Sequence, residues 1–99
     1  MLEYLFIFGY ESPEEWRVNQ SQATDFESSS AVWIVASDPE VAQRAGHCYA
    51  DRWVNDLFLK QGIETYPGWA ASGFAHWIEL EPLHRFSGMA LEMLDRIEA

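Results

Sequence analysis

Three short segments of the chain are almost wholly apolar, and each is followed by glycine, proline or polar residues. Residues 2–9, 31–36 and 74–80 are rich in β-branched and aromatic side chains, which favour β-strands. The first two are apolar at nearly every position, and this predicts strands that are covered on both faces. The third alternates, with His76 on one face and Trp77 on the other. The sequence therefore predicts a sheet of about three strands.

Two helices are predicted between these strands. Ser12 suits the N-cap of a short helix from Pro13 to about Asn19, because proline is favoured at the first helical position and Glu15 completes a capping box. A longer helix is expected from Pro39 to about Lys60. Its apolar residues recur at steps of three and four, as expected for a buried stripe: Val41, Ala42, Ala45, Tyr49, Trp53 and Leu57.

The remaining segments are predicted as loops and a last helix. Residues 21–30 are polar and form a loop anchored by Phe26, and residues 64–73 form a loop in which Pro67 and Gly68 suit a type II turn. After Pro82 a C-terminal helix capped by Ser87 is expected. It takes its apolar stripe from the following residues: Phe86, Met89, Ala90, Met93, Leu94 and Ile97.

These elements predict an α+β fold in a single domain over residues 1–99. The expected order is strand, short helix, strand, long helix, strand, helix, arranged as a two-layer sandwich. The long and the C-terminal helix would cover one face of the sheet. The other face is left to the short helix, a loop or another subunit, so that exposed tryptophans are expected there. The pattern does not determine the order of the strands.

Charge and cysteine content narrow the functional classes. Sixteen acidic residues oppose six basic ones, which gives a formal net charge of −10 at pH 7. A negative field of this size repels nucleic acids and anionic membranes and favours a basic protein partner, although it also simply maintains solubility. The single cysteine, Cys48, excludes a disulfide framework. The apolar residues 1–8 are too short to span a membrane and lack the basic region of a signal peptide, so a cytoplasmic location is expected.

No catalytic or cofactor motif stands out. Phosphate-binding, zinc-protease, hydrolase and calcium-loop patterns are absent from the sequence, and no cofactor or metal is predicted. His47 and Asp51 share a helix face and could orient a proton, but two ligands do not define a metal site, and a surface pair explains them. Cys48 points away from His47 and suits a small buried residue. His84, in a polar connector, is expected to be solvated.

The aromatic residues offer the best candidates for binding. Tyr66 and Trp69 flank the predicted turn, and the chain holds five tryptophans, although core packing also accounts for most of them. One hypothesis is a protein-interaction module, a homodimer or the partner of a basic protein. The alternative is a small-molecule-binding protein or enzyme with an aromatic pocket around His76. The predicted binding residues are Trp33, Tyr66, Trp69, His76 and Trp77.

Overall fold

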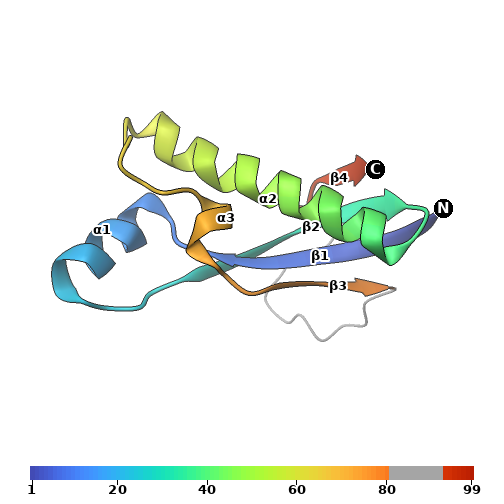
Figure 1. Cartoon of the computed structure of the whole chain (residues 1–99), viewed down its shortest axis with the longest axis horizontal. Helices are drawn as coiled ribbons and strands as arrows, with labels where there is room; N and C mark the ends of the chain where they lie inside the picture. The colour runs from blue at the N-terminus through green and yellow to red at the C-terminus, as the bar shows by residue number, and fades with distance from the viewer. Residues whose placement is uncertain (81–92) are drawn as a thin grey trace.

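A mixed four-stranded sheet packed against helices forms the framework of the protein, as seen in a computed structural model that describes residues 1–80 and 93–99. The α+β class predicted from the sequence is therefore confirmed. The strand order is β3-β1-β2-β4 (Figure 1). The elements follow one another as β1 (Leu2–Tyr10), α1 (Pro13–Gln22), β2 (Ser28–Ala36), α2 (Pro39–Lys60), α3 (Trp69–Ser72), β3 (His76–Leu80) and β4 (Arg96–Glu98).

The apolar strand β1 lies in the interior of the sheet. It pairs antiparallel with β2 on one side, with Leu5 opposite Trp33, and antiparallel with β3 on the other, with Ile7 opposite Trp77. Both faces of an interior strand are available for packing, which explains why β1 shows an unbroken apolar run rather than an alternating pattern. The apolar character of β1 on both faces thus agrees with its central position in the sheet.

The predicted three-stranded sheet and C-terminal helix need correction at one edge. Residues Arg96–Glu98 form a fourth strand that runs parallel to β2, with Ile97 opposite Ile34. The amide of Trp33 donates to the carbonyl of Asp95, and the amide of Ala99 donates to that of Val35. The outer edge of β2 thus forms backbone hydrogen bonds with residues 95–99. These bonds outweigh the helical pattern at the end of the sequence. The remainder of the predicted helix, with His84, lies outside the described residues.

Side chains cap the starts of both longer helices, and the capping box predicted at Ser12 is confirmed. The Ser12 hydroxyl accepts from the Glu15 amide at 3.1 Å, and the Ser12 amide donates to the Glu15 carboxylate at 2.8 Å, so the capping box is complete. Asp38 caps α2 by accepting from the Val41 amide at 3.0 Å.

Several boundaries differ from expectation. Helix α1 runs to Gln22 rather than ending near Asn19, and strand β3 starts at His76 rather than at residue 74. Strand β2 starts earlier, at Ser28, because its serines pair with the end of β1, and a short helix, α3, forms within the predicted 64–73 loop.

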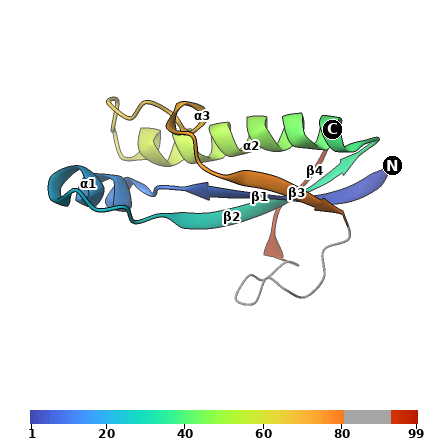
Figure 2. The ribbon, with the colours of Figure 1, turned by 60° about the horizontal axis from the view of Figure 1, so that its bottom comes forward.

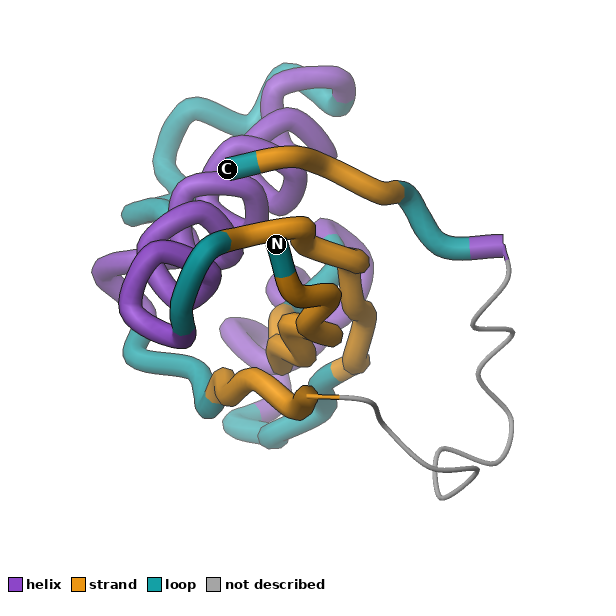
Figure 3. Tube along the Cα trace, turned by 90° about the vertical axis from the view of Figure 1, so that its right-hand side faces the viewer, coloured by secondary structure: helices purple, strands orange, loops and turns teal. Residues whose placement is uncertain are grey.

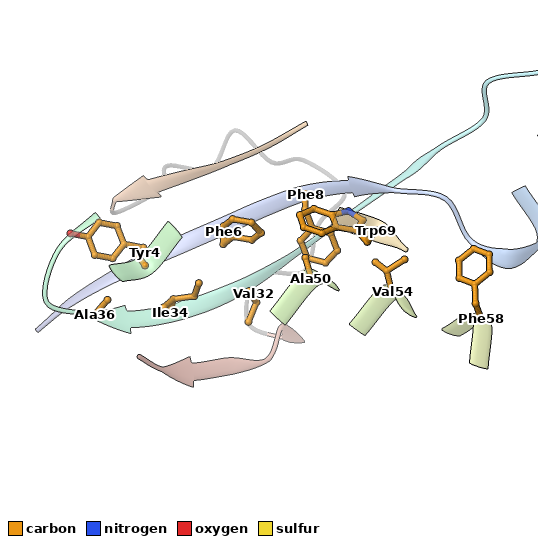
Figure 4. Packing of buried hydrophobic residues seen from close by; sticks show 11 residues of the cluster. Tyr4, Phe6, Phe8, Val32, Ile34, Ala36, Ala50, Val54, Phe58 and Trp69 are labelled. Atoms are coloured by element: carbon orange, nitrogen blue, oxygen red, sulfur yellow. The ribbon is translucent and has the colours of Figure 1, made fainter. Parts of the chain in front are cut away.

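Helix α2 covers one face of the sheet and forms the main core with it (Figure 2). Gly46, in the middle of this helix, lies directly against the ring of Phe6. The tube view along the sheet shows α2 and the strands as separate layers (Figure 3). The buried residues of this core come from β1, β2, α2 and α3 (Figure 4): Tyr4, Phe6, Phe8, Val32, Ile34, Ala36, Ala42, Ala50, Val54, Phe58 and Trp69.

The face of the sheet opposite α2 holds a second, smaller cluster. Leu5, Ile7 and Ala31 are buried there, and Trp33 and Leu94 pack against them. The chain's own residues therefore shield the middle of this face, which the sequence pattern left to the short helix, a loop or another subunit. This face of the sheet is less shielded at β3, where the side chain of Trp77 is 45% exposed.

Residues 1–80 and 93–99 contain no helix that combines the length and the apolar character needed to cross a bilayer.

Candidate functional site

The five predicted binding residues lie on two different sides of the sheet. Trp33 and Trp77 are opposite Leu5 and Ile7 in the strand register and therefore share the face that points away from α2. His76 is opposite Phe8 and points to the α2 side, where Tyr66 and Trp69 also pack. The structure thus does not gather Trp33 and Trp77 with His76 in one aromatic pocket.

Trp69 is a core residue that anchors α3 to the rest of the fold. Its side chain is 1% exposed, and its indole N–H donates to the carbonyl of Gly9 at 2.8 Å. Two side chains of α2 hold the start of α3, because Asn55 accepts from the Trp69 amide and Asp51 from the Ala70 amide, both at 3.0 Å. Asp51 therefore has a structural partner on α3, which the sequence-based pairing with His47 did not anticipate.

Tyr66 packs flat against the end of α2. Its ring is stacked on that of Phe58, with centroids 3.6 Å apart and planes 2° apart, and Trp16 meets it edge-on. Burial is the main reason why the pKa of the Tyr66 hydroxyl is raised. The half-buried ring lines a hollow of about 330 Å³ beside Ile63 and Pro67. Tyr66 is thus partly a packing residue and partly the wall of a surface depression.

Two histidines that are distant in sequence meet beside Trp69. His47 comes from α2 and His76 from β3, and their ring centroids are 5.4 Å apart. Each imidazole also contacts the buried indole of Trp69. The distance between ring centroids is 4.9 Å for His47 and 5.4 Å for His76. His76 Nδ1 lies 3.0 Å from the carbonyl oxygen of Phe74. The sequence did not indicate that the two histidines meet. His47 lies in α2 and His76 in β3, and their contact depends on how the helix packs on the sheet.

The outer edge of β3 is the second candidate site. This strand is the last one on its side of the sheet in the described part of the chain. Trp77 and Leu80 belong to opposite faces of the strand, and their side chains are 45% and 49% exposed. Apolar side chains therefore flank a strand edge whose outward backbone groups have no neighbouring strand among the described elements.

A groove beside α2 contains a tyrosine whose pKa is strongly raised. It has a volume of about 370 Å³ and is lined by Tyr49, Arg52, Trp53, Asp56 and Asp95. The Tyr49 hydroxyl donates to the Asp95 carboxylate at 2.7 Å. Burial first, and then this hydrogen bond and the negative charge of Asp95, raise the pKa of Tyr49 far above its ordinary value. The contact ties the segment before β4 to α2.

This raised pKa predicts a loss of stability at alkaline pH. The folded protein retains the Tyr49 proton where the unfolded chain, with a pKa of about 10, releases it. The contribution is complete below pH ~10 and is lost as the pH rises towards the higher pKa of the folded state. We expect the Tyr49→Phe protein, which cannot ionise there, to lose less stability than the wild type above pH ~10. Urea unfolding at several pH values measures the free energy of unfolding of both proteins. An equal loss of this free energy with rising pH in the two proteins would contradict the prediction.

Comparisons with protein families, curated proteins and solved structures find no match to this chain. Among residues 1–80 and 93–99, no three His, Cys, Asp or Glu side chains gather as a group that could hold a metal ion. The edge of β3 and the pair formed by His47 and His76 are the two candidate functional sites that the geometry supports.

Proposed function

We propose that the protein is an acidic interaction module that binds an extended segment of a basic protein along the outer edge of β3. The observation that supports this most directly is the pair of exposed apolar side chains, Trp77 and Leu80, on an edge strand. An extended peptide added to such an edge gains backbone hydrogen bonds, while its side chains contact residues on both faces of the strand. Tryptophan is also among the residues most enriched at binding hot spots.

The composition of β3 agrees with a binding edge rather than a protected one. Proteins commonly protect edge strands with lysine, proline or a bulge, since an exposed apolar edge promotes unwanted pairing. The sequence of β3 is His-Trp-Ile-Glu-Leu, in which Glu79 is the only acidic or basic residue apart from His76. This edge therefore lacks the usual positive protection.

The net charge favours a basic partner over a second copy of the chain. Each molecule carries a formal charge of −10, so two copies repel each other on approach. A basic segment is instead attracted, which speeds its association and makes binding sensitive to salt. A homodimer through β3 remains the competing arrangement, and the experiment below separates the two.

A Trp77→Ala substitution should weaken binding of a basic strand-forming peptide. The probe is a fluorescent peptide of alternating lysine and valine, with an alternating glutamate and valine peptide for comparison, and anisotropy gives the Kd. We expect only the basic peptide to bind, with roughly 10- to 30-fold weaker affinity for Trp77→Ala, as for a hot-spot residue. Leu59, which is 68% exposed near the end of α2, provides the control variant Leu59→Ala, and its affinity should be unchanged.

Three results would contradict the proposal. Equal binding of the acidic peptide would remove the charge argument. Equal loss of affinity in Leu59→Ala and Trp77→Ala would show that the contact is not specific to the edge of β3. A dimer in light scattering that dissociates on Trp77→Ala substitution would assign this edge to a second copy instead of a basic partner.

A further inference from the structure

We propose that His47 and His76 together bind one divalent transition-metal ion of the Zn²⁺ type, with water completing the coordination sphere. This inference concerns other side chains than the proposed function. His76 belongs to β3 but meets His47 on the α2 side of the sheet, and neither Trp77 nor Leu80 is a ligand. Neutral imidazole is a common ligand for Zn²⁺, Ni²⁺ and Cu²⁺.

The separation of the two rings suits a shared ion. Two imidazoles that bind one tetrahedral ion through nitrogens at ~2.0–2.1 Å have ring centroids about 5 Å apart. The centroids of His47 and His76 are 5.4 Å apart, with ring planes inclined by 70°. The separation of the two rings therefore fits a shared ion towards which each ring turns one nitrogen, with α2 and β3 in place.

A backbone contact already defines which nitrogen of His76 is available. With a proton on Nδ1, the ring donates to the Phe74 carbonyl at 3.0 Å, and Nε2 keeps a lone pair. Histidine ligands in metal sites usually make this kind of hydrogen bond through the nitrogen that does not bind the metal, and it fixes both the tautomer and the ring orientation. His76 thus has the support expected of a ligand.

The nitrogens of the pair are accessible from solvent. In residues 1–80 and 93–99, no buried side-chain nitrogen or oxygen lacks a hydrogen-bond partner. Within the described part of the chain, His76 makes one hydrogen bond, to Phe74, and His47 makes ring contacts alone. Both side chains are half-buried, so their remaining nitrogens are not enclosed in the core.

Trp69 and the overall charge provide further support for the site. The indole of Trp69 is 1% exposed and contacts both imidazoles, so it restricts their movement. Preorganised ligands lose less conformational entropy on binding. The net charge of −10 raises the local concentration of cations around the protein. Two imidazoles are one protein ligand fewer than an open zinc site has, so water must fill the remaining positions and binding should be weaker than at such a site.

Calorimetric titration of the whole chain with ZnCl₂ tests the inference, because it gives both the number of bound ions and the affinity. We expect one ion per chain and an affinity that falls roughly tenfold or more in His47→Ala and in His76→Ala, since each removes one of two protein ligands. The third histidine offers the matched control, and His84→Ala should bind as the wild type does.

A measurement on the unmodified protein covers the possibility that a substitution unfolds the chain. Imidazole nitrogen resonances of the wild type, recorded by NMR during the ZnCl₂ titration, should show the Nε2 signal of His76 shifting while Nδ1 stays protonated. Resonances of His47 and His76 that do not change at saturating Zn²⁺ would overturn the inference. An undiminished affinity in His47→Ala or His76→Ala, or a loss in His84→Ala as large as in either, would do the same.

Discussion

Replacing Trp69 with alanine should lower the free energy of unfolding by about 3–5 kcal/mol, the range for large aromatic residues removed from a core. The side chain is 1% exposed and meets the ring of Phe8 edge-on at 5.9 Å. Its removal leaves a cavity between α2, α3 and β1. The Gly9 carbonyl also loses the indole N–H from which it accepts a hydrogen bond. Because small domains are stable by only ~5–15 kcal/mol, the variant should be close to unfolded at 25 °C.

Two further variants separate the causes of this loss. Trp69→Phe keeps an aromatic ring but lacks the indole N–H, so it should fall between the wild type and Trp69→Ala. Trp77→Ala removes the same type of side chain from a position that is 45% exposed, and it should cost less than about 1 kcal/mol. Urea unfolding monitored by circular dichroism measures all three. Equal costs for the two alanine variants would show that Trp69 does not hold the core together.

Replacing Gly46 with alanine should also destabilise the protein, by roughly 1–3 kcal/mol, the cost of overpacking a core. A Cβ atom at this position would lie 2.2 Å from Cδ2 and 2.3 Å from Cγ of Phe6. Helix propensity alone predicts the opposite sign, because alanine is favoured over glycine by about 1 kcal/mol inside a helix. The clash outweighs that gain, since the ring of Phe6 is fully buried and packs against Phe8 and His76.

The close contact can be tested by combining two substitutions. Phe6→Leu shortens the side chain that faces Gly46, so the double variant with Gly46→Ala should lose less stability than the sum of the two single losses. The melting temperature of Gly46→Ala alone should fall by on the order of 10 °C in a domain of this size. A melting temperature above that of the wild type would mean that helix propensity decides and that α2 moves away from the sheet at little cost.

Local signals in the sequence predicted much of the fold. The capping box of Ser12 and the N-cap of Asp38 fixed where α1 and α2 begin, because these hydrogen bonds involve residues three positions apart. The apolar run of β1 predicted an interior strand. Strand β4 could not be predicted in the same way, since its hydrogen bonds depend on the distant edge of β2.

The candidate sites were predicted only in part. His76 and Trp77 were singled out, but strand alternation alone, which places them on opposite faces, did not reveal the neighbours of either. The contact of His76 with His47 depends on how α2 lies over the sheet, and no spacing in the sequence encodes it. Trp69 was predicted as an aromatic residue of a loop. It is buried instead and donates a hydrogen bond to Gly9, which lies 60 positions away in the chain, so no local pattern indicates its burial.

The central position of β1 also affects how the chain folds during synthesis. Leu5 pairs on one side with Trp33 but on the other with Glu79. At ~5–20 residues per second, a ribosome needs roughly 4–15 s to add the ~70 residues that separate β1 from β3. During that interval, one edge of the most apolar strand has no partner from its own chain. A slow, non-local folding step and a need for chaperone protection of the nascent chain are the expected consequences.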